Sequence, residues 1–156
     1  MIIREGNAAD ADAVYGMICD MEGKRLPRGS FDRIYAEQVA DRDHHRFIIA
    51  DAGDDAGPVG VLHLRMEDQL HHAGRIAEIM ELAVASGHRD AGLGSKIFAR
   101  ACEIARDAGC LQIEVACNQL RHDAHRFYQR QGMHNFHYKF SLPLAGEDSG
   151  ENVLGR

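Results

Sequence analysis

The stretch VASGHRDAGLGSKIF, residues 84–98, joins an apolar run to a helical pattern through a loop with three glycines. Glycine-rich loops before a helix are typical of phosphate-binding sites, and their spacing separates the types. The P-loop pattern fails, because it requires Gly-Lys-Ser/Thr and the order here is Gly94-Ser95-Lys96. The dinucleotide-binding pattern fails because Ile97 stands where a third glycine is required. What remains is an RxxGxG loop, residues 89–94, at the start of a helix.

Such a loop has the chemistry of an anion site. Backbone N–H groups at a helix start lack helical acceptors, and the helix dipole adds about half a positive charge there. Gly92 and Gly94 let the backbone approach phosphate oxygens closely, and Arg89 or Lys96 could add charge. The alternative is a helix start with flexible glycines and nothing bound.

Length and composition favour one globular domain. The 156 residues are 45% hydrophobic and 27% charged, and the net charge of −6 argues against wholesale nucleic-acid binding. We expect no membrane span, because no apolar stretch approaches about 20 residues. The start, MIIREGNAAD, lacks a signal-like apolar region, and the cysteines show no CxxC pairing. These features predict a cytoplasmic protein with reduced thiols.

Apolar periodicity predicts an α+β domain with a central mixed, mostly antiparallel twisted sheet and helices on both faces. The domain should span residues 1–144, and 145–156 should be a disordered acidic tail. The expected helices are 11–21, 31–41 with Ser30 as N-cap, 93–108 and 123–131. The expected strands are 2–5, 47–51, 58–66, 75–84, 110–117 and 136–142.

Two neighbouring patterns identify the loop. The strand EIMELAV, residues 78–84, precedes it, and an A-x-x-F-Y-x-x-x-G element runs from Ala124 to Gly132. With the RxxGxG loop, these resemble the GCN5-related N-acetyltransferase (GNAT) superfamily. The resemblance implies an α/β-type GNAT fold, acetyl-CoA as cosubstrate and direct acetyl transfer to a primary amine.

A narrower similarity is to the aminoalkylphosphonate N-acetyltransferases. It rests on LHHAG (70–74), AEIMELAV (77–84), LGSKIFA (93–99) and RHDAHRFY (121–128), and it departs at GKRLPRGSF (23–31). This departure leaves other acceptors open: a polyamine, an antibiotic or a protein amine. A CoA-binding sensor without catalytic activity is a further alternative. Because many relatives are dimers, the resemblance also suggests a homodimer.

The resemblance implies two catalytic residues. Glu78 matches the glutamate base that deprotonates the amine, and Tyr128 matches the tyrosine that protonates the departing CoA sulfur. The alternatives are a carboxylate paired with an arginine and an aromatic ring that only packs. Strand alternation predicts that Glu81 faces the opposite side from Glu78 unless a bulge intervenes, so Glu81 is expected to be structural.

The resemblance also implies the acetyl-CoA contacts. The amide of Leu82 would polarise the thioester carbonyl, that of Val84 would pair with the pantetheine arm, and the loop would bind the diphosphate. Asn118 would order cofactor or water. The expected cofactor-binding residues are Leu82, Ala83, Val84, Arg89, Asp90, Ala91, Gly92, Leu93, Gly94, Ser95 and Asn118.

Two further groups of residues leave their roles open. The histidines His71, His72, His122 and His125 invite a metal, but spacing completes no ligand set, so we expect no protein metal site. A divalent ion that bridges a phosphonate to His or Glu side chains stays an alternative. The cations Lys24, Arg25, Arg28 and Arg33 would either select an anionic acceptor or form a solvated basic loop.

Overall fold

The computed structural model describes residues 1–53 and 55–145. Apart from Ala145, the predicted acidic tail lies outside the described residues. The chain divides into two compact units, the first ending at Val115 and the second beginning at Ala116, and each is described here by itself. Among the described helices, none has the length and apolar character that a membrane crossing requires.

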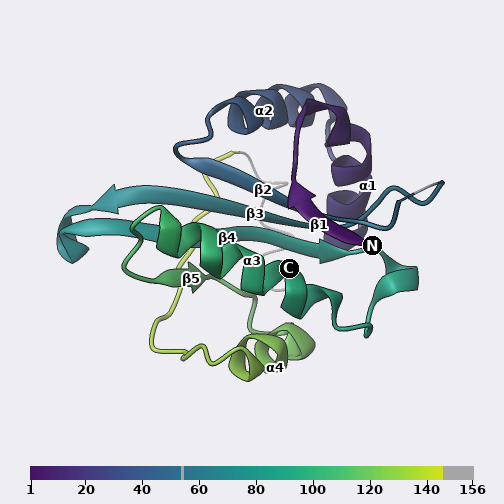
Figure 1. Ribbon diagram of the computed structural model, residues 1–156. Helices are drawn as coiled ribbons and strands as arrows, with labels where there is room; N and C mark the ends of the chain where they lie inside the picture. Colours follow the sequence, from purple (N-terminus) through teal and green to yellow (C-terminus); the bar gives the residue numbers. More distant parts are fainter. Residues whose placement is uncertain (54, 146–156) are drawn as a thin grey trace. The chain divides into compact units, whose positions relative to one another are not determined.

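The first unit is built on a five-stranded sheet in the order β1-β2-β3-β4-β5 (Figure 1). The first three pairings are antiparallel and the β4–β5 pairing is parallel, which confirms the predicted mixed, mostly antiparallel sheet. The elements of this unit are β1 (Ile2–Glu5), η1 (Ala8–Asp10), α1 (Ala11–Glu22), α2 (Arg28–Ala40), β2 (His45–Asp51), β3 (Pro58–Gln69), η2 (Leu70–His72), β4 (Gly74–Val84), η3 (Ser86–His88), α3 (Leu93–Asp107) and β5 (Ile113–Val115).

Helices cover both faces of this sheet, as predicted. On one face, Phe47, Ile49 and Val61 form a buried cluster with apolar residues of α1 and α2. On the other face, α3 lies so close that a Cβ on Gly60 would stand 2.8 Å from Ile97 Cδ1. Side chains alternate between faces along a strand, so adjacent residues such as Ile49 and Ala50 serve different helices.

The second helix begins earlier than predicted. It spans Arg28–Ala40 rather than 31–41, and Ser30 lies inside it. The reason is local: Pro27 has a φ of −58°, which suits a helix start, and the Phe31 amide already donates to the Pro27 carbonyl at 3.0 Å.

The strand predicted for 136–142 is wrong. The second unit contains α4 (His122–Arg130), and no strand is assigned among its described residues. Phe136, Tyr138 and Phe140 do alternate, but they are 81%, 83% and 93% exposed. Alternation identifies side chains that could share a buried face, whereas a strand also needs a neighbour to complete its hydrogen bonds.

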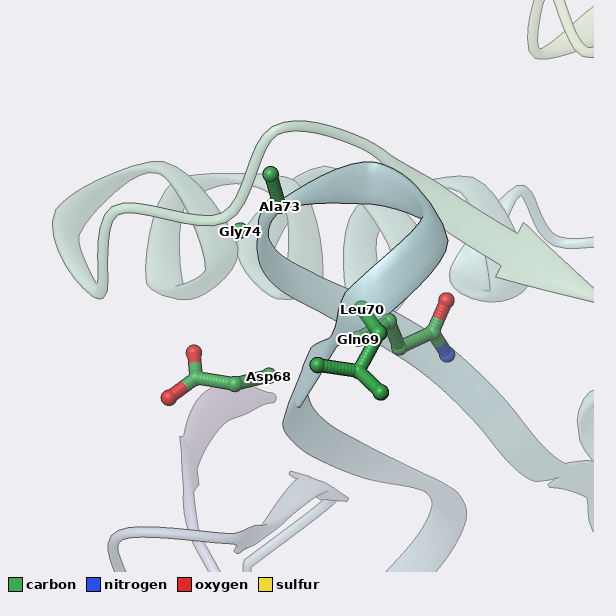
Figure 2. A pocket seen from close by; sticks show the side chains of 5 residues that line it. All are labelled: Asp68, Gln69, Leu70, Ala73 and Gly74. Carbon is green, nitrogen blue, oxygen red and sulfur yellow. The ribbon is translucent and has the colours of Figure 1, made fainter.

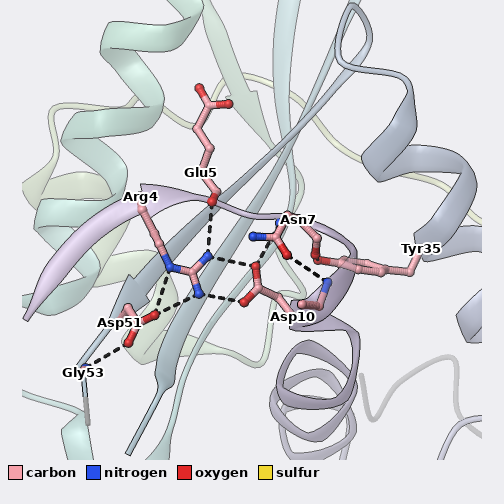
Figure 3. A network of polar contacts seen from close by, with 8 residues as sticks. Arg4, Glu5, Asn7, Asp10, Tyr35, Asp51 and Gly53 are labelled. Carbon is pink, nitrogen blue, oxygen red and sulfur yellow. Dashed lines mark hydrogen bonds and ion pairs between the residues drawn. The ribbon is translucent and has the colours of Figure 1, made fainter.

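An ion-pair network fastens the first strand to the first helical turn (Figure 3). The Arg4 guanidinium donates to both carboxylate oxygens of Asp10, at 2.9 and 2.7 Å, and to Asp51 at 2.9 Å. Burial raises the pKa of Asp10, but hydrogen bonds from Arg4 and from the Asn7 amide outweigh it and hold the pKa below its usual range. Asp10 is almost completely buried, so its charge depends on Arg4.

We therefore expect Arg4→Met to destabilise the fold by about 2–4 kcal/mol at pH 7, because it leaves the Asp10 carboxylate buried without its cation. A carboxyl with a lowered folded pKa stabilises the fold above its unfolded pKa and loses that contribution as pH falls. The difference from wild type should therefore shrink below about pH 4. Urea unfolding at several pH values measures this difference in the free energy of unfolding. Arg33→Met, at an exposed pair with Glu37, is the control and should cost under about 0.5 kcal/mol; equal losses would contradict the expectation.

Candidate active site

The glycine loop joins the end of a strand to the start of a helix, as its sequence predicted. After β4, η3 leads to Asp90 and Gly92, whose φ values of 64° and 71° are left-handed, and Gly92 is the N-cap of α3. The Lys96 amide makes the first helical bond, to the Gly92 carbonyl at 3.3 Å. Arg89 Nε turns back and donates to the Val84 carbonyl at 3.1 Å. The loop is thus fixed against the end of β4.

The last residues of β4 have a strand neighbour on one side within the first unit. β5 pairs with β4 only from Ala77 to Ile79. On the other side, the Ala85 amide donates to the carbonyl of Val59, in β3, at 2.8 Å. Successive amides of a strand point to opposite sides, so those of Leu82 and Val84 point away from β3. This is the side on which β5 has already ended.

A bulge in β4 overturns the predicted placement of Glu81. Ile79 pairs with Leu64 and Glu81 pairs with His63, so Met80 is an extra residue without a partner on β3. An extra residue shifts the alternation by one. Glu78 pairs with Arg65, two residues from His63, so both glutamates lie on the same face of the sheet. The prediction that they face opposite sides is wrong.

The two carboxylates have different partners. Glu78 Oε2 accepts a hydrogen bond from Arg65 at 2.7 Å, which is the arginine pairing named as the alternative to a catalytic role. Glu81 Oε2 lies 2.7 Å from Nδ1 of His63, a side chain that is 5% exposed. The Phe47 ring stacks on His63 with centroids 4.3 Å apart. Glu81 therefore contacts a buried, ordered imidazole.

A cavity of about 490 Å³ lies beside the loop. It brings Lys24 and Arg25, from the turn after α1, together with Arg89, while Asp20 supplies the opposite charge. Its lining residues are Cys19, Asp20, Gly23, Lys24, Arg25, Ser86 and Arg89. Arg28 and Arg33, predicted as part of the same cationic rim, instead form ion pairs on the helix surface with Asp12, Asp32 and Glu37.

A second cavity, of about 450 Å³, lies at the opposite end of the β3–β4 hairpin (Figure 2). Asp68, Gln69, Leu70, Ala73 and Gly74 line it. It is at the start of β4, whereas the glycine loop follows the end of this 11-residue strand. It therefore contributes nothing to the site beside the loop.

The second unit carries Tyr128 and Asn118. Tyr128 lies on α4, half-buried, and burial raises its pKa to about 12. Its phenol is therefore protonated at neutral pH. Asn118 accepts from the Leu120 amide with its side chain, at 2.8 Å, and its carbonyl lies 2.7 Å from His125 Nε2. Asn118 thus orders the turn that leads into α4.

Within the described residues, no three His, Cys, Asp or Glu side chains lie together as a metal site would require. The His122 and His125 rings are 5.9 Å apart between centroids, and those of His71 and His72 are 4.2 Å apart. The members of each pair are close in the sequence, and the part of the chain that the structure describes adds no third ligand to either pair.

Comparisons with known proteins identify the family. A family model described as "Acetyltransferase (GNAT) family" matches residues 11–133. The chain belongs to the GNAT family. A curated relative, the aminoalkylphosphonate N-acetyltransferase of Salmonella typhimurium, is 36% identical over 142 residues, which cover 91% of this chain and 90% of the relative. The protein is therefore an acyltransferase.

Solved structures show the same GNAT fold. A protein from Bacillus halodurans described as a transcriptional regulator is 26% identical, with a TM-score of 0.81 and coverage of 92% of this chain and 99% of that one. The glucosamine-6-phosphate N-acetyltransferase of Arabidopsis thaliana is 20% identical, with a TM-score of 0.74 and coverage of 92% and 97%.

Sequence reasoning missed Arg65, His63 and His45. They contact Glu78 and Glu81 directly or through one another, yet they lie on neighbouring strands 13 to 36 residues away in the chain. The one available signal was His63, a histidine inside the apolar strand VGVLHLRM. Only the strand register places these side chains together.

Proposed function

We propose that this GNAT enzyme transfers an acetyl group from acetyl-CoA to the primary amine of a small acceptor that carries an anionic group, such as an aminoalkylphosphonate. The observation that carries the proposal is the junction at Val84. There the glycine loop, suited to a diphosphate, is held by Arg89 against a strand end whose Leu82 and Val84 amides point away from β3. A thioester bound along that edge would meet the Leu82 amide as its carbonyl becomes negative.

The chain also has residues suited to the proton steps. An alkylamine with a pKa near 10.4 is about 99.9% protonated at neutral pH, so it must lose a proton before it attacks. Glu78 is the proposed base in the attack, using the carboxylate that Arg65 holds in place. Tyr128 is the proposed acid for the leaving thiolate, and its raised pKa keeps the phenol protonated until that step.

The cavity supports the anionic acceptor. Lys24, Arg25 and Arg89 place three cations against one carboxylate, Asp20, in a protein whose net charge is −6. Local positive charge of this kind attracts an anion where the protein as a whole does not. The Salmonella relative is named for aminoalkylphosphonates, which combine an amine with such an anion.

The test measures thiol release from acetyl-CoA with two acceptors: aminomethylphosphonate, and a primary amine of similar size that carries no anionic group. We expect kcat/KM to be at least about tenfold higher for the phosphonate, and Arg25→Gln to remove most of that preference. Arg33→Gln, whose ion pair lies on the exposed helix surface, is the matched control. Equal values for both amines would contradict the anionic acceptor.

The same assay separates the alternatives. Polyamines, aminoglycosides and a protein N-terminus are included in the panel, and each reaction is repeated with EDTA to test a bridging divalent ion. Thiol release with none of these amines, from protein that binds CoA, would favour a sensor over an enzyme with this acceptor class. The expected homodimer stays a prediction that mass measurement in solution tests.

A further inference from the structure

Three side chains of the first unit form a continuous hydrogen-bonded chain. Glu81 Oε2 lies 2.7 Å from His63 Nδ1, and His63 Nε2 lies 2.9 Å from His45 Nδ1. The three come from β4, β3 and β2, in that order across the sheet. His63 uses both ring nitrogens, so it bridges a carboxylate and a second imidazole.

The surroundings hold these three hydrogen-bonded side chains in place. His63 is buried under the Phe47 ring, which stacks on it at 7° between planes, and the half-buried His45 ends the chain. The charged groups around the two imidazoles are Glu81, Asp41, His44 and Arg65. Burial, together with His63, lowers the pKa of His45. A neutral imidazole at this end can accept a proton on one nitrogen and release one from the other.

The proposed reaction requires such a path. Acetyl transfer from acetyl-CoA to an ammonium acceptor yields an acetamide, CoA thiol and one free proton. Two protons therefore leave the acceptor nitrogen in each turnover, one before attack and one after the C–N bond forms. The departing thiolate takes up one proton, and the other must reach solvent. The bulge places two carboxylates, Glu78 and Glu81, on one face of the sheet, so the two protons have two acceptors.

We propose that Glu81 takes the first proton, from the incoming ammonium group, and that His63 and His45 carry it to solvent. This inference rests on the proposed function. The relay begins with both imidazoles protonated on Nε2: Glu81 passes the proton to His63 Nδ1, the Nε2 proton of His63 moves to His45 Nδ1, and the Nε2 proton of His45 leaves to solvent. Both imidazoles then carry their proton on Nδ1, and they return to the Nε2–H forms before the next turnover. Glu78 takes the second proton once the C–N bond has formed, and this proton replaces the one that Tyr128 gives to the thiolate. His63 and His45 are thus positioning residues that act through Glu81.

The decisive variant is His45→Asn, whose amide can still hydrogen-bond His63 but cannot relay a proton. We expect kcat/KM at pH 7 to fall about 10- to 100-fold. The loss should shrink as pH rises toward the amine pKa near 10.4, where the acceptor is already neutral. It should also nearly vanish at pH 7 with an acceptor amine that is neutral at that pH. His63→Gln should show the same pattern.

The matched control is His72→Asn. It changes a half-buried histidine that is hydrogen-bonded to Gln69 and takes no part in the Glu81–His63–His45 series. It should leave the pH profile unchanged, and circular dichroism should show every variant folded. An equal loss at all pH values and with both acceptors would mean a structural role and would overturn the proton path alone. Wild-type protein that transfers no acetyl group would overturn the proposed function, and the path with it.

Discussion

Replacing Tyr128 with phenylalanine is expected to lower kcat by about 10²- to 10³-fold while CoA binding stays nearly unchanged. The substitution removes one oxygen and keeps the ring. That ring packs edge-on against the ring of Phe127, with the two centroids 5.2 Å apart. If the phenol protonates the thiolate, its loss affects the transition state and leaves ground-state binding intact. The burial that raises the Tyr128 pKa to about 12 keeps this proton in place over the neutral range.

The measurement pairs steady-state kinetics with calorimetry of CoA binding. Tyr138→Phe removes the same atom from a tyrosine that is 83% exposed, and it should change neither quantity. A variant Tyr128→Phe that loses CoA affinity in proportion to its activity would show that the side chain packs against the cofactor site and donates no proton. Near wild-type kcat would exclude the acid role altogether.

The second large effect is expected at Gly92. Its φ of 71° favours glycine, but Asn and Asp tolerate this region, and a Cβ there would meet no atom within 4 Å. Gly92→Asn and Gly92→Asp therefore give two folded proteins that differ by one charge. We expect the aspartate variant to bind CoA about 10- to 100-fold more weakly than the asparagine variant, because its carboxylate would repel a diphosphate at the start of α3.

Calorimetry of binding to CoA and to pantetheine tests this expectation. Pantetheine lacks the diphosphate, so the two variants should bind it equally. The difference in CoA affinity between the two variants should also become smaller with added salt, because salt screens the repulsion between exposed charges. Equal CoA affinities for both variants would place the diphosphate elsewhere and remove the main support for acetyl-CoA at this loop.

The glycine loop could be read from the sequence because its properties are local. A residue with φ of 71° favours glycine, and unpaired amides follow from a helix start, so residues 89–94 carry both signals in a short stretch. The apolar periods likewise predicted the sheet and α3. The order of strands and the helices on both faces then follow the usual rules for burying apolar faces.

The face of Glu81 could not be read from the sequence. A bulge at Met80 reverses the alternation after it, and nothing in EIMELAV distinguishes a bulge from a regular strand. The sequence likewise could not show which cationic side chains of the segment 24–33 line the cavity. Lys24 and Arg25 line the cavity while Arg28 and Arg33 pair with nearby carboxylates, although all four look alike as a basic segment.

By itself, then, the sequence determined the glycine loop, the family and the helices and strands of the first unit, because each depends on residues close together in the chain. The tertiary structure alone decided which side chains share the face of Glu78, and it alone brought His63 and His45 to Glu81. The physical reason is that these contacts depend on strand register: one extra residue turns every later side chain to the other face, and no local preference records that shift.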